Sequence, residues 1–364
     1  MKTRIDSIDI SKGICITLVV LFHSRLSHYI PGINSSLGLL RLPCFFFLSG
    51  IFFNELKKFK TVFLSRTDSL LKPYFITLFG LLFTGLLLRK EGFHPEEAKG
   101  IIYGVGDTIR ITPLWFLTHL WALQLLAWLF IKTTKINLQK RYIQIVFILG
   151  LCFLGWIIIS RFYNMNIKIM GSDGKMPGLP FSIDIALVSG AYFLAGRFLR
   201  EEVKNFKPSA HIALPAVIGF VSIVLFTDAA IDFNKRIYHN FIFATLGATS
   251  GIYLCLCLGY AINKQGLVKK MFCYLGTGSL FILIFHGYFE YKTGVFLENL
   301  SITLPSILIA VFSFVLSILL SLIMRLIIEK VSFLSLFYLP FRINPIFLHV
   351  RYKWQKSQIR LKVE

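Results

Sequence analysis

Residues 302–328 read ITLPSILIAVFSFVLSILLSLIMRLII, a run whose one charged side chain is Arg325. A helix needs about 20 mostly apolar residues to cross a bilayer, so this run is long enough to span. Nine other apolar segments follow the same pattern, at 13–30, 37–54, 70–88, 113–131, 143–160, 183–199, 210–227, 241–262 and 275–297. The sequence therefore predicts an all-α fold, a polytopic integral membrane bundle of about ten transmembrane helices.

The composition excludes an ordinary soluble protein. Hydrophobic residues make up 55% of the 364 positions and charged residues 16%, against roughly 25% charged in a typical globular domain. A net charge of +21 would suggest a nucleic-acid partner in a soluble chain. Here the basic residues are spread over short loops and form no basic domain, so no nucleic acid is expected and the charge is interpreted as a topology signal.

The distribution of Lys and Arg predicts the orientation. Loops on alternate sides of the ten predicted spans carry 27 and 12 basic residues, which together account for all 39. The richer side includes both ends of the chain, and the positive-inside rule puts that side in the cytoplasm. Both termini are therefore expected to be cytoplasmic, in a multi-pass protein of the inner or plasma membrane.

Two regions follow from the pattern of spans. Residues 1–330 are predicted to form one transmembrane domain. Residues 331–364 are predicted to form an interfacial segment and a basic cytoplasmic tail. The apolar stretch from Val331 to Phe341 is too short to span and is interrupted by Pro340, and the tail from Arg351 onward is rich in basic residues.

The six cysteines indicate neither a disulfide framework nor a metal site. All lie in or beside apolar runs, at Cys15, Cys44, Cys152, Cys255, Cys257 and Cys273. The C-x-C pair at 255 and 257 has too short a spacing for one helix face, because residues two apart on a helix point about 200° away from each other. Lipid-facing or packing roles are expected instead.

Polar groups inside the predicted spans are candidates for function, because each costs about 2.5 kcal/mol or more in hydrocarbon. Those groups are His23, Arg41, His119, Asp184 and His286. Structural roles stay open for three of them. His119 could hydrogen-bond a neighbouring helix, Arg41 could snorkel to the interface, and Asp184 could cap a helix.

Lys12 and His23 are predicted to project from one face of the first helix. They are eleven residues apart, about 20° past three full turns and about 16 Å along the axis. The imidazole is expected near the membrane midplane and the ammonium at the cytoplasmic mouth. Asp9, three residues before Lys12, is placed to hold that ammonium.

Six stretches resemble one known family in the right order. They are IDISKGICITLVVLFH at 8–23, LPCFFFLSGIFF at 42–53, LLKPY at 70–74, PLWFLTHLW at 113–121, LPFSIDIALVSGAYFLAG at 179–196 and GTGSLFILIFH at 276–286. The chain resembles membrane-bound acyltransferase family 3 and, within it, the branch of sugar O-acetylases that includes fucose 4-O-acetylase-like proteins. The resemblance covers most of the predicted spans. Arg41 departs from it, because histidine is common at that position in this branch.

The resemblance implies transfer of an acyl group, usually acetyl from cytoplasmic acetyl-CoA, to a hydroxyl of a cell-surface or lipid-linked carbohydrate. Acetyl-CoA would be the donor, with no resident cofactor. Cations would bind its phosphates, at Lys12, Arg66 and Lys72. His23 would be the general base, with His286 or His119 positioning the acceptor or stabilising the oxyanion. The supporting or substrate-binding residues implied are Asp9, Arg41, Trp115, His119, Asp184 and Ser279.

The alternative from another class is a transporter that exports a polysaccharide or a lipid-linked sugar, with the intramembrane polar residues lining its path. Such a protein commonly contains two related halves with interrupted helices. The sequence shows no such internal symmetry. The enzyme is therefore the favoured interpretation.

Overall fold

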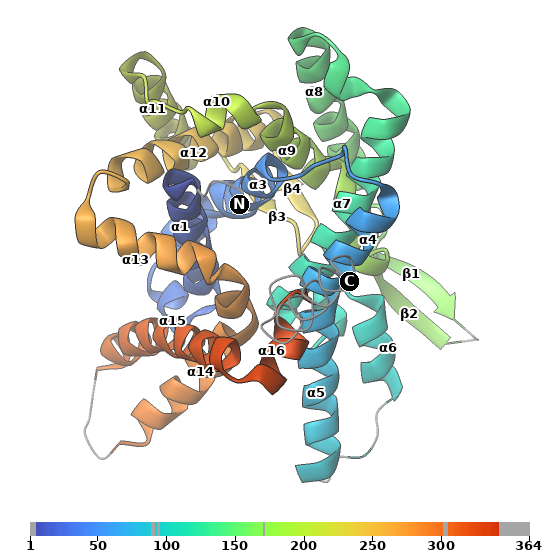
Figure 1. The fold of residues 1–364 in the computed structure, drawn as a ribbon, viewed down its shortest axis with the longest axis vertical. Coiled ribbons are helices and arrows are strands. Elements are labelled where there is room, and N and C mark those ends of the chain that lie inside the picture. The colour runs from blue at the N-terminus through green and yellow to red at the C-terminus, as the bar shows by residue number, and fades with distance from the viewer. Residues whose placement is uncertain (1–4, 89–91, 93–94, 170–171, 301–304, 342–364) are drawn as a thin grey trace, which may run out of the picture.

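The computed structural model describes residues 5–88, 92, 95–169, 172–300 and 305–341, and this part of the chain is almost entirely helical (Figure 1). The longer helices are α1 (Asp6–His23), α3 (Gly38–Ile51), α5 (Lys72–Leu88), α7 (Trp115–Thr134), α8 (Arg141–Ile158), α9 (Ala186–Phe198), α11 (Ala210–Phe226), α12 (Phe241–Ile262), α13 (Gly266–Thr277), α14 (Ser279–Glu298) and α15 (Ser306–Lys330). Shorter ones are α2 (Pro31–Ser36), α4 (Phe59–Arg66), α6 (Pro95–Tyr103), α10 (Arg200–Lys204) and α16 (Ser332–Tyr338).

The prediction of a polytopic membrane bundle is confirmed. Among the described residues, 7 helices are long and apolar enough to cross a membrane, or 8 if the bent pair α13–α14 counts as one span. The prediction of ten exceeds this number. Each of the ten predicted segments does contain a helix, but α11 is a short one, and α1 carries three charged residues at its start.

The first predicted segment is misplaced by about two turns. Helix α1 begins at Asp6 and ends at His23, where the prediction was 13–30. Asp6 and Asp9 lie in its first turns, where the positive end of the helix dipole favours carboxylates. His23 is therefore the last residue of α1 and lies about 25 Å from its start, so the expected position at mid-helix is wrong.

Helix α1 packs against α3, α12, α13 and α14. The closest approach is to α13, where a Cβ on Gly276 would collide with the backbone of Asp9, and one on Gly13 would collide with the backbone of Phe272. Small residues allow such contact between membrane helices, where packing replaces the hydrophobic effect as the driving force. Helix α1 is thus held by neighbours on several sides.

The segment predicted as one span at 275–297 is broken. Helices α13 and α14 meet at Gly278 and are bent by 83° relative to each other. The bend turns α14 so that its first half packs beside α1, with the ring of His286 next to that of His23. A continuous helix along α13 would follow a different direction.

Two small antiparallel hairpins were not predicted. Strand β1 (Tyr163–Ile169) pairs with β2 (Ser172–Pro177), and β3 (Ala230–Asp232) pairs with β4 (Ile237–His239). The β3–β4 hairpin connects α11 to α12 and packs against α3. Its loop residues Asp232, Asn234 and Lys235 line the same cavity as His23.

The predicted interfacial segment 331–341 contains α16, which packs on α15 and α5. Its Tyr338 hydroxyl lies 3.4 Å from the hydroxyl of Thr77. The basic tail from Arg351 lies outside the described residues. The cytoplasmic orientation of the termini stays a prediction.

Candidate active site

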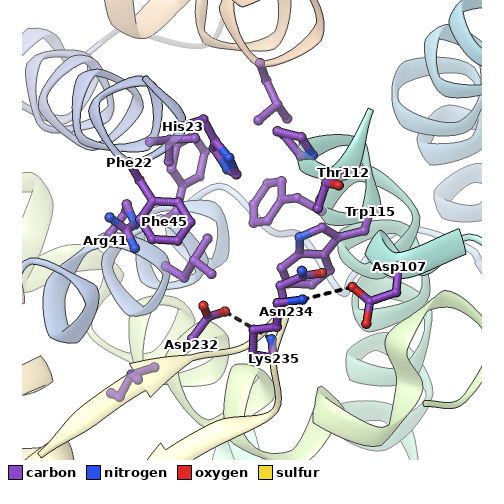
Figure 2. Close-up of a pocket in the computed structure, with 16 residues that line it drawn as sticks. Phe22, His23, Arg41, Phe45, Asp107, Thr112, Trp115, Asp232, Asn234 and Lys235 are labelled. Atoms are coloured by element: carbon purple, nitrogen blue, oxygen red, sulfur yellow. Dashed lines mark hydrogen bonds and ion pairs between the residues drawn. The ribbon is translucent and has the colours of Figure 1, made fainter. Parts of the chain in front are cut away.

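A cavity of about 300 Å³ lies where α1, α3, α7 and α14 meet the β3–β4 hairpin (Figure 2). Its lining combines aromatic rings with charged and amide groups, from Val19, Phe22, His23, Arg41, Leu42, Phe45, Asp107, Thr112, Pro113, Trp115, Phe116, Ile231, Asp232, Asn234, Lys235 and Leu283. Three residues selected from the sequence, His23, Arg41 and Trp115, line this one cavity. An aromatic and polar lining is suited to a ligand that presents hydroxyl groups on an apolar ring.

His23 presents its imidazole to this cavity from the end of α1. The side chain is exposed, unlike most of its helix. Its ring contacts Phe22 edge-on, with the two centroids 4.9 Å apart. An imidazole that faces a polar cavity is accessible to a substrate hydroxyl, which is the geometric requirement for a general base.

His286 lies behind His23 on α14, and its ring centroid is 5.7 Å from that of His23. The side chain is 1% exposed. Its Nδ1 lies 2.7 Å from the carbonyl oxygen of Ile282 and 3.1 Å from that of Leu283. A carbonyl only accepts, so Nδ1 carries the proton and Nε2 of the neutral ring is an acceptor.

The acceptor nitrogen of His286 is buried and has no hydrogen-bond partner among the residues that the structure describes. A buried polar atom without a partner is costly, and such atoms are concentrated at functional sites. In the neutral ring this nitrogen can accept a proton or a hydrogen bond but cannot donate one. His286 is therefore arranged to orient a donor next to His23.

Arg41 is buried rather than snorkelling, with 6% of the residue exposed. Its guanidinium lies over the ring of Phe22, 3.8 Å from the centroid, and donates a hydrogen bond of 3.2 Å to Asn34 Oδ1. Asp232, on the hairpin, attracts it electrostatically, and both residues line the cavity (Figure 2). Arg41 thus places a positive charge in the part of the cavity wall beside the hairpin.

The hairpin wall carries charged groups that pair with one another. Lys235 Nζ lies 3.2 Å from Asp107 Oδ1, and the backbone N–H of Lys235 donates to Asp232 Oδ1 at 3.1 Å. The hydrogen bond to Asp107 raises the pKa of Lys235 above its usual value, so its ammonium stays charged at neutral pH. These pairs fix the loop that faces His23.

A buried ion pair anchors the hairpin to the rest of the fold. Arg236 Nε lies 2.8 Å from Asp184 Oδ2, and both side chains are 0% exposed. Arg236 also donates to the Ser182 hydroxyl at 3.2 Å and to the Asn234 carbonyl at 2.6 Å. Asp184 is therefore neither a helix cap nor a cavity residue. Its role in the structure is to fix the hairpin through Arg236.

His119 is a structural histidine. It is 0% exposed and is not among the residues that line the cavity. Its Nδ1 donates to the Phe181 carbonyl at 3.2 Å, and its Nε2 accepts from the Ser189 hydroxyl at 2.8 Å. Phe181 and Ser182 have φ values of 56° and 54°, a left-handed conformation that costs non-glycine residues energy, and the His119 bond stabilises it. The proposed catalytic alternative for His119 has no support in this geometry.

Comparison with known protein families identifies the family of the chain. Residues 5–326 match the model of the acyltransferase domain of family 3. The chain belongs to acyltransferase family 3. No curated protein and no solved structure matches it. Membership of this family makes the protein a membrane-bound acyltransferase, which favours the enzyme over the transporter, and an acyltransferase needs an acyl donor and an acceptor.

In this acyltransferase the cation expected at the mouth of α1 does not line the cavity. Lys12 Nζ lies 4.0 Å from Asp9 Oδ1, as the spacing predicts, and 4.2 Å from the ring centroid of Phe52. The eleven residues to His23 correspond to about 16 Å along α1. Lys12 and His23 thus lie at separate levels of one helix.

The other two cations expected to bind the donor lie around a π-helical stretch, Thr67–Leu71. Arg66 ends α4 just before it. Lys72 follows it and lies 2.6 Å from Asp68 Oδ1, 2.7 Å from the carbonyl oxygen of Leu339 and 3.8 Å from the ring centroid of Phe341. Lys72 therefore already holds the segment after α16.

Ser279 is half-buried and begins α14 directly after the bend at Gly278. It does not line the acyltransferase cavity. Two turns of α14 separate it from His286, so its place in the structure is the start of the helix that carries that histidine.

Sequence reasoning missed the loop residues of the site. They are Asp107, Thr112, Asp232, Asn234 and Lys235, with Arg236 behind them. All lie between the predicted spans, where no periodicity distinguishes a cavity wall from a solvated loop. The only available signal was charge, and Lys235 and Arg236 were counted as topology.

Proposed function

We propose that this acyltransferase moves an acetyl group from cytoplasmic acetyl-CoA to a hydroxyl of a cell-surface or lipid-linked carbohydrate, with His23 as the general base. The observation that carries this proposal is the exposed imidazole of His23 in a cavity with aromatic and charged walls. Family membership supplies the acyl transfer itself. The lining of the cavity supports a carbohydrate acceptor, and the resemblance to sugar O-acetylases supports acetyl-CoA as the donor.

In the proposed reaction His23 takes the proton of the acceptor hydroxyl as the oxygen attacks the thioester carbonyl. The C–O bond forms, the C–S bond breaks, and the coenzyme thiolate takes up the proton that His23 holds. Imidazole is suited to both proton steps because its usual pKa lies near neutral pH. No metal and no redox partner is needed to balance this step.

His286 would assist by accepting a hydrogen bond at Nε2. Its Nδ1 is committed to the carbonyls of Ile282 and Leu283, so the neutral ring has no proton for an oxyanion. An acceptor role toward the sugar hydroxyl or toward an N–H of His23 agrees with the 5.7 Å between the rings. This favours positioning over oxyanion stabilisation.

The carbohydrate would bind between Trp115 and the hairpin. An indole face suits the apolar face of a sugar ring, and Asp107, Asn234 and Lys235 supply donors and acceptors for its hydroxyl groups. Arg41 adds a fixed positive charge, which would favour an acidic sugar or a lipid-linked phosphate.

The donor would approach from the other end of α1. Lys12 and Arg66 would bind its phosphates, and the pantetheine arm would run along α1 toward His23. Because His23 ends the helix, transfer would take place toward the membrane face opposite the N-terminus. Lys72 would contribute indirectly by placing the segment after α16.

The decisive experiment measures incorporation of label from acetyl-CoA into glycan, in membranes that contain wild-type or His23→Ala protein. Removal of a general base should lower the rate by about 10²- to 10⁴-fold. His211→Ala is the matched control, because His211 is an exposed histidine on α11. Undiminished incorporation with His23→Ala would overturn the assignment of the base.

A further inference from the structure

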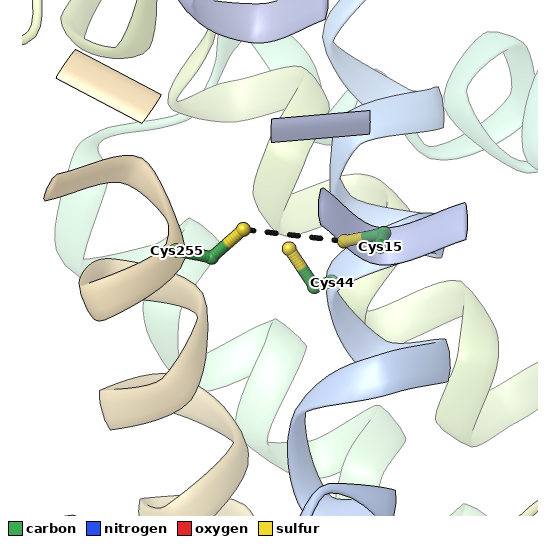
Figure 3. A group of neighbouring side chains, drawn as sticks. All are labelled: Cys15, Cys44 and Cys255. Carbon is green, nitrogen blue, oxygen red and sulfur yellow. Dashed lines mark hydrogen bonds between the residues drawn. The ribbon is translucent and has the colours of Figure 1, made fainter. Parts of the chain in front are cut away.

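Three cysteines from three helices meet in the core of the bundle. Cys15 on α1, Cys44 on α3 and Cys255 on α12 are all buried, and their sulfur atoms lie within 4.8 Å of one another (Figure 3). The sulfurs of Cys15 and Cys255 are 4.0 Å apart. We propose that this trithiol cluster binds one soft metal ion and that Cu(I) is the ion that it fits.

The spacing of the sulfur atoms suits three-coordinate binding. When an ion lies in the plane of three sulfur atoms and about 2.3 Å from each, the sulfur atoms are about 4.0 Å from one another. One pair has this separation already, and no pair is wider than 4.8 Å. Small side-chain rotations of cysteine are enough to close the remaining gap, without a shift of the helices.

The set of available ligands selects the ion. Thiolates favour soft ions such as Cu(I), and Zn²⁺ almost always takes four ligands in a structural site. No fourth His, Cys, Asp or Glu from the part of the chain that the structure describes joins the group. All three cysteines belong to the main hydrophobic core, and Ser11 is a buried polar neighbour of Cys255. A dry site with three sulfurs therefore favours Cu(I).

The binding step needs no oxidant. Copper stays monovalent, and each thiol that becomes a thiolate releases one proton to solvent as its metal–sulfur bond forms. Cys255 now donates a weak S–H contact of 3.8 Å to the carbonyl oxygen of Ser11. That contact would be given up when the Cys255 sulfur turns to the metal.

A metal ion at this point would link α1 and α3, two of the helices that carry cavity residues. His23 lies eight residues beyond Cys15 on α1, about 12 Å along the axis, and Arg41 lies three residues before Cys44 on α3, about 4.5 Å away. The ion would act by positioning these helices and would not touch the substrate. Loss of the ion would make the relative position of His23 and Arg41 less fixed.

The test measures copper bound by the purified full-length protein in detergent, with Cu(I) buffered by bicinchoninate under anaerobic, reducing conditions. We expect one copper ion per chain and an X-ray absorption spectrum with a shell of sulfur alone. Cys15→Ser, Cys44→Ser and Cys255→Ser should each weaken binding by more than about 100-fold, because each removes a ligand rather than a supporting contact. Cys257→Ser and Cys273→Ser are controls, since both cysteines are only half-buried and lie outside the cluster.

Thermal unfolding separates loss of a ligand from loss of the fold. Cu(I) should raise the unfolding temperature of the wild type and of both controls, and should leave that of Cys44→Ala unchanged. The X-ray absorption spectrum of the wild type tests the proposal even if a variant does not fold. Failure of the wild type to retain copper, a shell of nitrogen or oxygen, or equal retention by Cys44→Ala would each overturn the proposal. None of these measurements depends on acyl transfer.

Discussion

The imidazole rings of His23 and His286 face each other at the edge of the cavity, with centroids 5.7 Å apart and planes inclined by 53°. One comes from the last residue of α1 and the other from the middle of α14. The first is exposed to the cavity, and the second is buried with an acceptor nitrogen left over. The two histidines therefore lie in different environments, one accessible from the cavity and one dry.

Two substitutions of His286 distinguish its nitrogens. His286→Asn keeps a donor for the carbonyls of Ile282 and Leu283, so the protein should fold but transfer acetyl far more slowly. His286→Gln places a polar group near the position of Nε2 and should retain more activity than the Asn variant. Initial rates with labelled acetyl-CoA, normalised to folded protein, check this order. Equal rates for the two variants would contradict a role for Nε2.

Removal of one partner from the buried ion pair of Asp184 and Arg236 should destabilise the protein strongly. Removal of one partner leaves a buried charge without compensation, so Arg236→Met should lower the free energy of unfolding by about 3–5 kcal/mol. The double variant with Asp184→Leu should lose less than the sum of the two single losses. Denaturant unfolding in detergent measures all three. Additive losses would show that the pair does not act as a unit.

Glu55 should give the protein an acid-sensitive component of stability. Burial alone would raise the pKa of Glu55, but the hydrogen bonds from Arg197, one of them 2.7 Å long, and the charge of Arg200 lower it below 4.5. A depressed pKa contributes stability above the unfolded value, and that stability is lost as the pH falls through the folded value. Glu55→Gln should therefore unfold at a lower temperature at neutral pH and depend less on pH below 4.5. Parallel acid profiles for the two proteins would contradict this.

Lys72 should act through the segment after α16 rather than on the donor. Because Asp68 and the Leu339 carbonyl already bind its ammonium, Lys72→Met and Asp68→Asn should lower the unfolding temperature by similar amounts. Neither should raise the KM for acetyl-CoA as much as Lys12→Met does. Thermal unfolding and steady-state kinetics check the two statements. A large KM effect confined to Lys72→Met would instead make Lys72 a donor ligand.

The helices could be predicted because apolar runs of sufficient length leave few alternatives in a bilayer. The residues at which the helices begin and end could not be predicted. Asp6 and Asp9 look like loop residues by hydropathy, yet they start α1, and this moved His23 from mid-helix to the helix end. Gly278 looks like any glycine in an apolar run, yet α13 and α14 part there at 83°.

Part of the site could also be predicted from the cost of polar groups in hydrocarbon. That cost selected His23 and Arg41, which line one cavity, and His286, whose ring lies next to that of His23. It also selected His119 and Asp184, which are buried in the folded chain and stabilised there by their partners Ser189 and Arg236. Tertiary contacts decide whether such a polar residue lies at the cavity or is paired in the core. These contacts cannot be read from a single sequence.

The β3–β4 hairpin makes substrate choice separable from catalysis. His23 lies on α1, which makes close backbone contacts with α13, whereas another wall of the cavity is a short loop fixed at its base by Arg236. Exchange of the loop residues Asp232, Asn234 and Lys235 would reshape the wall while the reacting groups stay in register. Substitutions confined to one turn could thus change which acceptor such an enzyme uses.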